Sequence, residues 1–217
     1  MYIPHFNAVG DPAEAHRMVE SIGSAELITV GPDGTPMATL LPILWSEDGS
    51  TVILHMARAN GHWKTMETGA KALAIITDAQ AYISPAWYAS KAEHGRVVPT
   101  WNYSAVHLTG AVEVHDDPEW VRMAVTKLTE RHEARRMEPW AVTDAPVRFV
   151  TGQLKAIVGI EMTVTGVEAK SKLSQNRSVD DRKGVIAGLT DEGGAREAIV
   201  ADHMRARMYP PDLGPCC

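Results

Sequence analysis

Short apolar runs separated by turn residues occupy the first third of the chain. Residues 25–30 and 37–45 flank the turn Gly-Pro-Asp-Gly at 31–34, which is a strong β-hairpin signal. A second turn at 47–50 leads into another apolar run at 51–56. Three consecutive strands joined by tight turns predict an antiparallel meander. Further strands are predicted from the buried or alternating runs at 71–77, 105–115 and 159–169.

Helical patterns separate and follow these strands. The segment Asp11-Pro12-Ala13-Glu14 provides an N-cap, a first-turn proline and a third-position carboxylate, and Gly23 ends the helix. A second helix begins at Asp117, and its basic end at 131–136 complements the helix dipole without needing a ligand. Other helical segments are 60–68, one opened by Pro146, one from Asp180 and 194–208. Five to seven strands edged by about five helices predict a mainly β, α+β fold, a small antiparallel barrel with peripheral helices.

The bulk composition limits the classes of protein that fit the chain. Its 217 residues suffice for one large domain or two small ones, and its 45% hydrophobic and 22% charged residues are ordinary for a globular protein. The net charge of −6 disfavours a surface that binds nucleic acid throughout, since phosphates need clustered lysine and arginine. No apolar run approaches the roughly 20 residues that span a bilayer, and no basic-then-apolar leader is visible. We therefore expect a cytoplasmic protein with no membrane partner, whose Cys216 and Cys217 are exposed thiols.

Residues 82–103 hold five of the thirteen aromatic residues of the chain. They form two short motifs, YISPAWY and PTWNY, around a polar loop. Aromatic, hydroxyl and amide groups side by side suit a flat ligand that is stacked and hydrogen-bonded. A corner of the core whose tyrosine and tryptophan heads bind backbone groups would give the same pattern. Residue chemistry alone leaves both interpretations open.

Two polar segments could bind an anion. The first falls where a strand ends and a helix begins, and there Arg58, Asn60 and Lys64 could face one phosphate. The alternative is a solvated turn in which Asn60 is the N-cap. The second segment, 170–177, is basic and amide-rich and could close over a phosphate or a ring edge, although such a run is more often a solvated connection.

Familiar catalytic patterns are missing from the sequence. It has no Gly-x-Ser-x-Gly elbow, no Walker loop and no Gly-x-Gly-x-x-Gly fingerprint. The nine histidines are scattered without a metal-ligand spacing, so no metal site is predicted. No side chain is nominated as a nucleophile, and the catalytic residues of any enzyme reaction stay unknown.

Six spaced blocks, in order, resemble the PaiB family of FMN-binding negative transcriptional regulators. They are MYIPHFN at the N-terminus, Ala38-Thr39-x-Leu41-Pro42, His55-x-Ala57-Arg58-Ala59-Asn60-x-His62-Trp63, YISPAWY, VPTWNY, and KLSQNRS ahead of Asp181-Arg182. The resemblance runs from residue 1 to about residue 190. It implies an FMN-binding domain at 1–190, with a C-terminal helix and tail at 191–217 packed on the same domain.

The resemblance implies a split β-barrel of the flavin-reductase and pyridoxamine-oxidase type, which forms a homodimer with FMN in a groove between subunits. The strand from Thr39 to Ile43 would lay its backbone along the flavin ring. A phosphate and ribityl site would follow it, and the aromatic stretch with residues 174–176 would line the ring or the dimer seam. The implied FMN-binding residues are Thr39, Leu41, Pro42, His55, Arg58, Asn60, Lys64, Ser84, Trp101, Gln175 and Asn176.

The chain departs from the family pattern at four positions. Leu40 replaces a histidine, Leu54 a glycine, Gly61 a proline and Ser171 an aromatic residue.

Three functions are consistent with the resemblance. The first is an FMN-binding sensor or negative transcriptional regulator, and the second is an FMN-dependent oxidoreductase that acts on a small metabolite, which could be aromatic. The third is a haem-binding protein. DNA is a partner by the family description only, because the chain is acidic and shows no helix-turn-helix.

Overall fold

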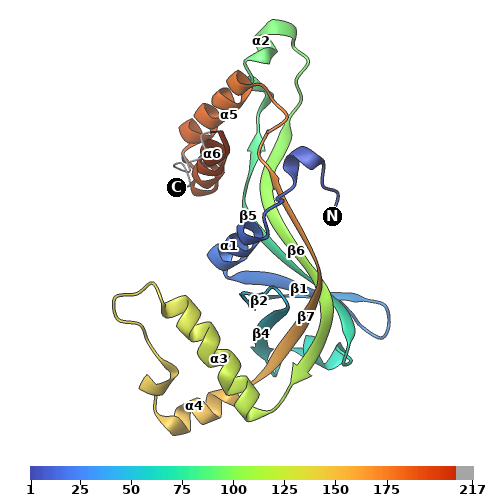
Figure 1. Ribbon diagram of the computed structural model, residues 1–217, viewed down its shortest axis with the longest axis vertical. Helices are drawn as coiled ribbons and strands as arrows, with labels where there is room; N and C mark the ends of the chain where they lie inside the picture. Colours follow the sequence, from blue (N-terminus) through green and yellow to red (C-terminus); the bar gives the residue numbers. More distant parts are fainter. Residues whose placement is uncertain (209–217) are drawn as a thin grey trace, which may run out of the picture. The chain divides into compact units, whose positions relative to one another are not determined.

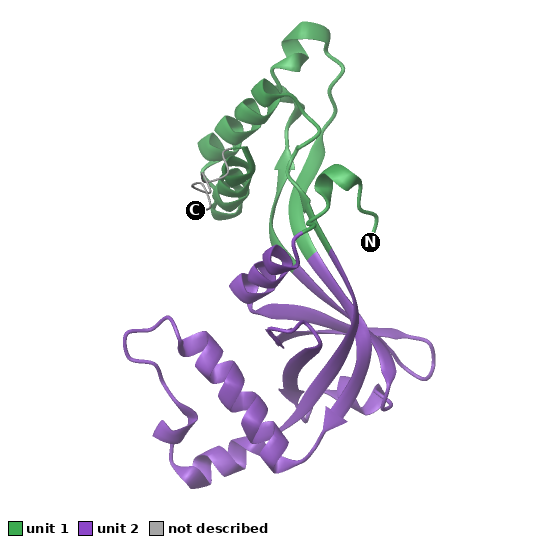
Figure 2. Ribbon diagram, in the orientation of Figure 1, with its two compact units in different colours: residues 1–10, 77–105, 169–217 green, residues 11–76, 106–168 purple. Residues whose placement is uncertain are grey.

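The computed structural model describes residues 1–208, whose backbone divides into two compact units (Figures 1 and 2). Unit 1 comprises residues 1–10, 77–105 and those from 169 onward, and unit 2 comprises 11–76 and 106–168. The boundary falls within three long strands. The division expected after residue 190 stays a prediction, and Cys216 and Cys217 lie outside the described residues.

Seven strands form one sheet, which confirms the predicted antiparallel architecture. They are β1 (Ser24–Val30), β2 (Pro36–Pro42), β3 (Leu44–Trp45), β4 (Thr51–Ala57), β5 (Ala70–Ile83), β6 (Thr100–His115) and β7 (Ile157–Lys172). Their order is β2-β1-β5-β6-β7-β4-β3. β1 pairs antiparallel with β2 and β5, and β4 pairs antiparallel with β3 and β7.

The middle strand of the predicted meander is divided in two. Both hairpins form, β1 with β2 and β3 with β4, but β2 and β3 lie at opposite ends of the strand order. Only Ile43 separates them in sequence, and β2 also contacts β4. The two edges of the sheet therefore meet at this residue, which curves the sheet of unit 2 into a barrel. Pro42 has no N–H to donate and marks the break.

Unit 2 packs its helices around this barrel. They are α1 (Pro12–Ile22), η2 (Gly61–Thr65), α3 (Pro118–Glu133), η4 (Val142–Asp144) and α4 (Val147–Leu154). The two predicted N-caps are confirmed, because Asp11 accepts from the N–H of Ala13 at 2.9 Å and Asp117 from that of Trp120 at 2.8 Å. The helix predicted over 60–68 is shorter, a single 3₁₀ segment. The most deeply buried side chains of the barrel include Leu27, Val52, Leu54, Ile76, Leu108, Val158, Ile160 and Met162.

Unit 1 contains η1 (His5–Asn7), η3 (Pro85–Trp87), α2 (Ser90–His94), α5 (Val179–Glu192) and α6 (Ala195–Met208). α5 and α6 pack on the ends of β5 and β7 through a cluster that includes Ile83, Leu173, Val185, Leu189, Val200 and Met204. Gly184 and Gly188 let α5 approach Trp87 closely, since a Cβ at either position would lie 2.0 to 2.4 Å from that residue. No helix within residues 1–208 is long and apolar enough to cross a membrane.

Candidate functional site

Strand β2 carries the first predicted FMN-binding residues. It is an edge strand that pairs with β1, so within residues 1–208 its other backbone edge has no strand partner. Leu41 is buried in the barrel, Thr39 and Pro42 are half-buried, and Leu40 points outward with 68% of its surface exposed. An unpaired row of N–H and C=O groups can receive the polar rim of a flat ring, as strand addition does in other proteins.

A buried histidine fixes β2 to the segment that follows β4. His62 is 1% exposed, and its Nδ1 lies 2.8 Å from Oγ1 of Thr39 while its Nε2 lies 2.9 Å from Oγ1 of Thr29. Burial lowers the pKa of His62, which favours the neutral imidazole with one donor and one acceptor nitrogen. The sequence did not predict this network, because His62 was identified only as one of the residues that carry the family resemblance.

Asn60 is the N-cap that the sequence offered as one interpretation, and its role as a phosphate ligand stays a prediction. Its Oδ1 accepts from the N–H of His62 at 3.0 Å, which makes it the N-cap of η2. Its Nδ2 donates to Oγ1 of Thr39 at 3.3 Å, which aligns the segment beside β2. Lys64, four residues on, is exposed, and its Nζ lies 5.7 Å from the centroid of the Trp63 ring. Among the described residues the Lys64 ammonium has no carboxylate partner, so its charge is available to an anion.

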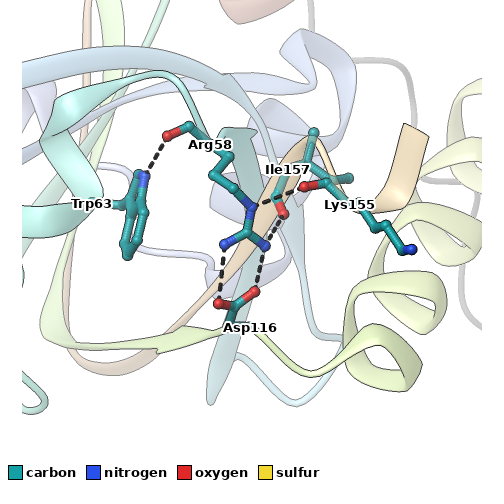
Figure 3. Close-up of polar contacts among 5 residues, drawn as sticks. All are labelled: Arg58, Trp63, Asp116, Lys155 and Ile157. Carbon is teal, nitrogen blue, oxygen red and sulfur yellow. Dashed lines mark hydrogen bonds and ion pairs between the residues drawn. The ribbon is translucent and has the colours of Figure 1, made fainter. Parts of the chain in front are cut away.

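Arg58 is held by protein groups on several sides (Figure 3). Its two Nη atoms form an ion pair with Asp116, with an Nη1–Oδ2 distance of 3.0 Å. Its Nε donates to the carbonyl of Lys155 at 2.8 Å, and Nη2 donates to that of Ile157 at 3.2 Å. The hydrogen bonds to Asp116 raise the pKa of Arg58 and lower the pKa of Asp116. A phosphate would have to share this guanidinium with Asp116. The role of Arg58 as a phosphate ligand stays a prediction.

His55, on β4, offers a polar atom without a protein partner. Its Nδ1 is buried, and no hydrogen-bond partner for it exists among residues 1–208. Burial lowers the pKa of His55, so the neutral ring is favoured. An orphaned buried nitrogen is costly unless a ligand or water meets it, which fits the predicted role of His55 in holding a bound group.

The four remaining predicted residues lie in unit 1. Ser84 caps η3 by accepting from the N–H of Ala86 at 3.2 Å. Gln175 folds onto its own turn, accepting from the N–H of Leu173 and donating to the carbonyl of Ser171. Asn176 is exposed. Trp101 is 45% exposed, and its Nε1 donates to Gln80 at 2.8 Å.

Polar side chains of segment 170–177 and of the aromatic stretch are buried in unit 1, where they bind one another. Nζ of Lys170 donates to Oη of Tyr103 at 2.8 Å and to the carbonyl of Tyr2 at 3.1 Å, which draws the N-terminal segment to β7. Asn102, fully buried, exchanges hydrogen bonds with Oγ of Ser174, the one non-glycine residue among those described whose φ is positive. The aromatic stretch is thus partly a structural corner, since Tyr103 and Asn102 have internal partners.

Comparison with known proteins decides the family. The profile of a family described as "Putative FMN-binding domain" matches residues 1–166. The protease synthase and sporulation protein PAI 2 of Bacillus subtilis (strain 168) is 30% identical over 210 residues, which cover 96% of this chain and 98% of that protein. The chain belongs to this FMN-binding family. FMN is therefore its cofactor, and the PaiB resemblance is confirmed.

Solved structures with the same fold include flavin proteins. The FAD and heme binding protein from Mycobacterium smegmatis aligns with a TM-score of 0.58 and 17% identity, over 84% of this chain and 80% of that chain. The flavocytochrome Anf3 from Azotobacter vinelandii aligns with a TM-score of 0.51 and 16% identity, over 77% and 70%. At these identities the likeness establishes the fold alone, a split barrel.

The groups present in unit 2 fit an FMN molecule. Within residues 1–208 the edge of β2 has no strand partner and suits the ring, Nδ1 of His55 has no hydrogen-bond partner, and the Lys64 ammonium has no carboxylate partner. Asp116, the partner of Arg58, was missed because nothing local in the sequence links residues 58 positions apart.

Proposed function

We propose that this protein is an FMN-binding homodimer that works as a flavin-dependent sensor or negative transcriptional regulator of the PaiB type. The observation that carries the proposal is the match to PAI 2, which extends over nearly the full length of both chains. The name of that relative connects it with protease synthesis and sporulation, which suits a regulatory protein better than a metabolic enzyme. The cytoplasmic location stays a prediction.

The chain's own residues would bind and orient the flavin rather than react with substrate. FMN supplies a ring that changes its charge and hydrogen-bonding pattern when it is reduced. Lys64 and Asn60 would hold the phosphate end, and the backbone of β2 would hold the ring edge. The hydrogen bonds between His62 and the hydroxyls of Thr29 and Thr39 hold β2 beside η2 before any ligand binds, which lowers the ordering cost of binding.

The homodimer is supported by exposed aromatic residues in unit 1. Tyr82 and Trp101 are 48% and 45% exposed, and their rings meet edge to face with centroids 6.3 Å apart. Tyrosine and tryptophan are enriched at protein interfaces. Sedimentation of the FMN-loaded protein should give the mass of two chains. Trp101→Ala should shift the protein toward one chain, and an unchanged dimer would exclude this pair from the interface.

Two measurements test the regulatory function. The purified protein should show a flavin absorbance spectrum, or take up one FMN per chain on titration; a haem spectrum would favour the third function considered above. A mobility-shift assay on the protein's own promoter should then give a complex whose affinity falls with salt and changes when the flavin is reduced. Flavin uptake without any DNA complex, in either redox state, would reject direct transcriptional regulation.

An FMN-dependent oxidoreductase is the second candidate. The exposed Tyr82–Trp101 pair, with Gln80 bound to Nε1 of Trp101, also presents stacking and amide groups that suit a small aromatic metabolite. NADH or NADPH should bleach the flavin, and an aromatic acceptor should restore its absorbance. A flavin that neither nicotinamide reduces on the timescale of minutes would remove this candidate.

A further inference from the structure

Unit 2 contains a pocket that shares only Arg58 with the predicted FMN-binding residues. Its volume is about 460 Å³, within the range of small-molecule sites. It lies at the first turn of α3 and the end of α4, beside the Arg58–Asp116 ion pair. Its lining residues are Arg58, Asp116, Pro118, Glu119, Val121, Arg122, Thr151, Leu154 and Lys155.

The lining combines an apolar floor with free cations. Val121 and Leu154 are buried side chains of the α3–α4 cluster, and the exposed Pro118 ring and Thr151 methyl supply the accessible apolar surface beside them. Arg122 and Lys155 are exposed, and their charged heads make no ion pair or hydrogen bond to any residue in 1–208. Figure 3 shows that Lys155 gives its carbonyl to Arg58 while its side chain extends away from the ion pair.

The balance of charge favours an anion. Arg58 and Asp116 neutralise each other, which leaves two cations, Arg122 and Lys155, against the one carboxylate of Glu119. Hydrogen bonds between a guanidinium or ammonium and a carboxylate are among the stronger ones in proteins. An inorganic anion would leave the exposed Pro118 ring and Thr151 methyl uncovered, whereas a neutral apolar molecule would leave both cations without a partner.

We propose that this pocket is a second ligand site, separate from the FMN site, for a small organic acid with an apolar body. The carboxylate would bind Arg122 and Lys155, and the body would cover the Pro118 ring and the Thr151 methyl. Of the eleven predicted FMN-binding residues only Arg58 lines the pocket, so the two ligands have largely separate sites.

Calorimetric titration of the FMN-loaded protein tests the proposal with three probes. They are 3-phenylpropionate, the neutral 3-phenylpropanol and inorganic phosphate. We expect 3-phenylpropionate to bind with one molecule per chain, at least about tenfold more tightly than either of the others, since it alone meets both halves of the pocket. Equal affinity for the acid and the alcohol, or no binding of the acid at 10 mM, would overturn the proposal.

Charge variants at the rim locate the site. Arg122→Gln combined with Lys155→Gln should weaken binding of the acid about tenfold or more, whereas Arg148→Gln, an exposed α4 residue outside the pocket, should leave it within about twofold. Glu119→Gln removes the opposing carboxylate and should tighten binding, a gain that misfolding cannot imitate. Unchanged affinity in the double variant, or release of FMN by the acid, would overturn a separate site.

Discussion

The hydrogen bonds of His62 give a stability prediction that the structure quantifies. In His62→Leu the side-chain volume is nearly kept, but Oγ1 of Thr29 loses its 2.9 Å partner in a site where Thr29 is 1% exposed. A buried hydroxyl left without a partner costs about 1–3 kcal/mol. Thr39 retains the 3.3 Å bond from Asn60, so its contribution is smaller. We expect the unfolding free energy to fall by about 2 kcal/mol.

A double-mutant cycle in urea separates this cause from a general packing loss. Thr29→Val leaves Nε2 of His62 unpaired and should cost about 2 kcal/mol as well, whereas the double variant removes both partners and should cost no more than either single change. The coupling energy should therefore be about 2 kcal/mol. Thr126→Val, which removes a solvent-exposed hydrogen bond at a half-buried helix position, is the control and should stay within about 0.5 kcal/mol. If the single effects add, the buried Thr29–His62 bond contributes nothing and the reasoning is refuted.

Three further predictions follow from the same residues and from the glycines. Lys64→Gln should weaken FMN binding about tenfold in a fluorescence-quenching titration, and more than Arg58→Gln, because Asp116 already neutralises the guanidinium; the reverse order would place the phosphate on Arg58. The pKa of His62 is lowered in the folded state, so its contribution to stability should be full above about pH 6.5 and fall as the pH drops below that value. The urea midpoint should therefore fall less between pH 7.5 and pH 5.5 in His62→Leu than in the unmodified protein. An equal fall in both proteins would contradict this prediction. Gly184→Ala should destabilise the protein by about 1–3 kcal/mol, because its Cβ would lie 2.0 Å from the carbonyl oxygen of Trp87. Gly152→Ala has open space around its Cβ and should stabilise the protein by up to about 1 kcal/mol. Thermal unfolding of both variants checks that the two effects have opposite signs.

Local features of the fold could be predicted from the sequence because a few neighbouring residues determine them. The N-cap of Asp11 and the turn between β1 and β2 each depend on groups within four residues of one another. The break at Pro42 and Ile43 could not be predicted in the same way. The nine-residue apolar run 37–45 has the same pattern whether it forms one strand or two strands at opposite edges of the sheet. Only the closure of the whole sheet distinguishes the two arrangements.

The same difference between local and distant contacts decides which parts of the candidate site could be predicted. The segment from Arg58 to Lys64 was identified because polar groups at a strand–helix junction are a local signal, and Asn60 is indeed the N-cap. The partners that fix that segment come from far away in sequence: Thr29 lies 33 residues from His62, and Asp116 lies 58 residues from Arg58. Nothing in the residue types of either pair reveals the contact before the strands are placed.

Three of the four departures from the family pattern, Leu40, Leu54 and Gly61, fall at positions that leave the proposed flavin contacts intact. Leu40 alternates with Thr39 and Leu41 along β2 and is exposed, so a histidine at this position would point away from the His62 network. If the flavin is held by the backbone edge of β2, exchanging this side chain changes the surface beside the ring but not the hydrogen bonds to it. Leu54 is fully buried and fills the barrel core, and Gly61 has open space around it. Leu40→His should therefore leave FMN affinity within about threefold and alter only what binds against the exposed side of β2; a larger change in FMN affinity would mean that the side chain at position 40, and not the backbone, meets the flavin.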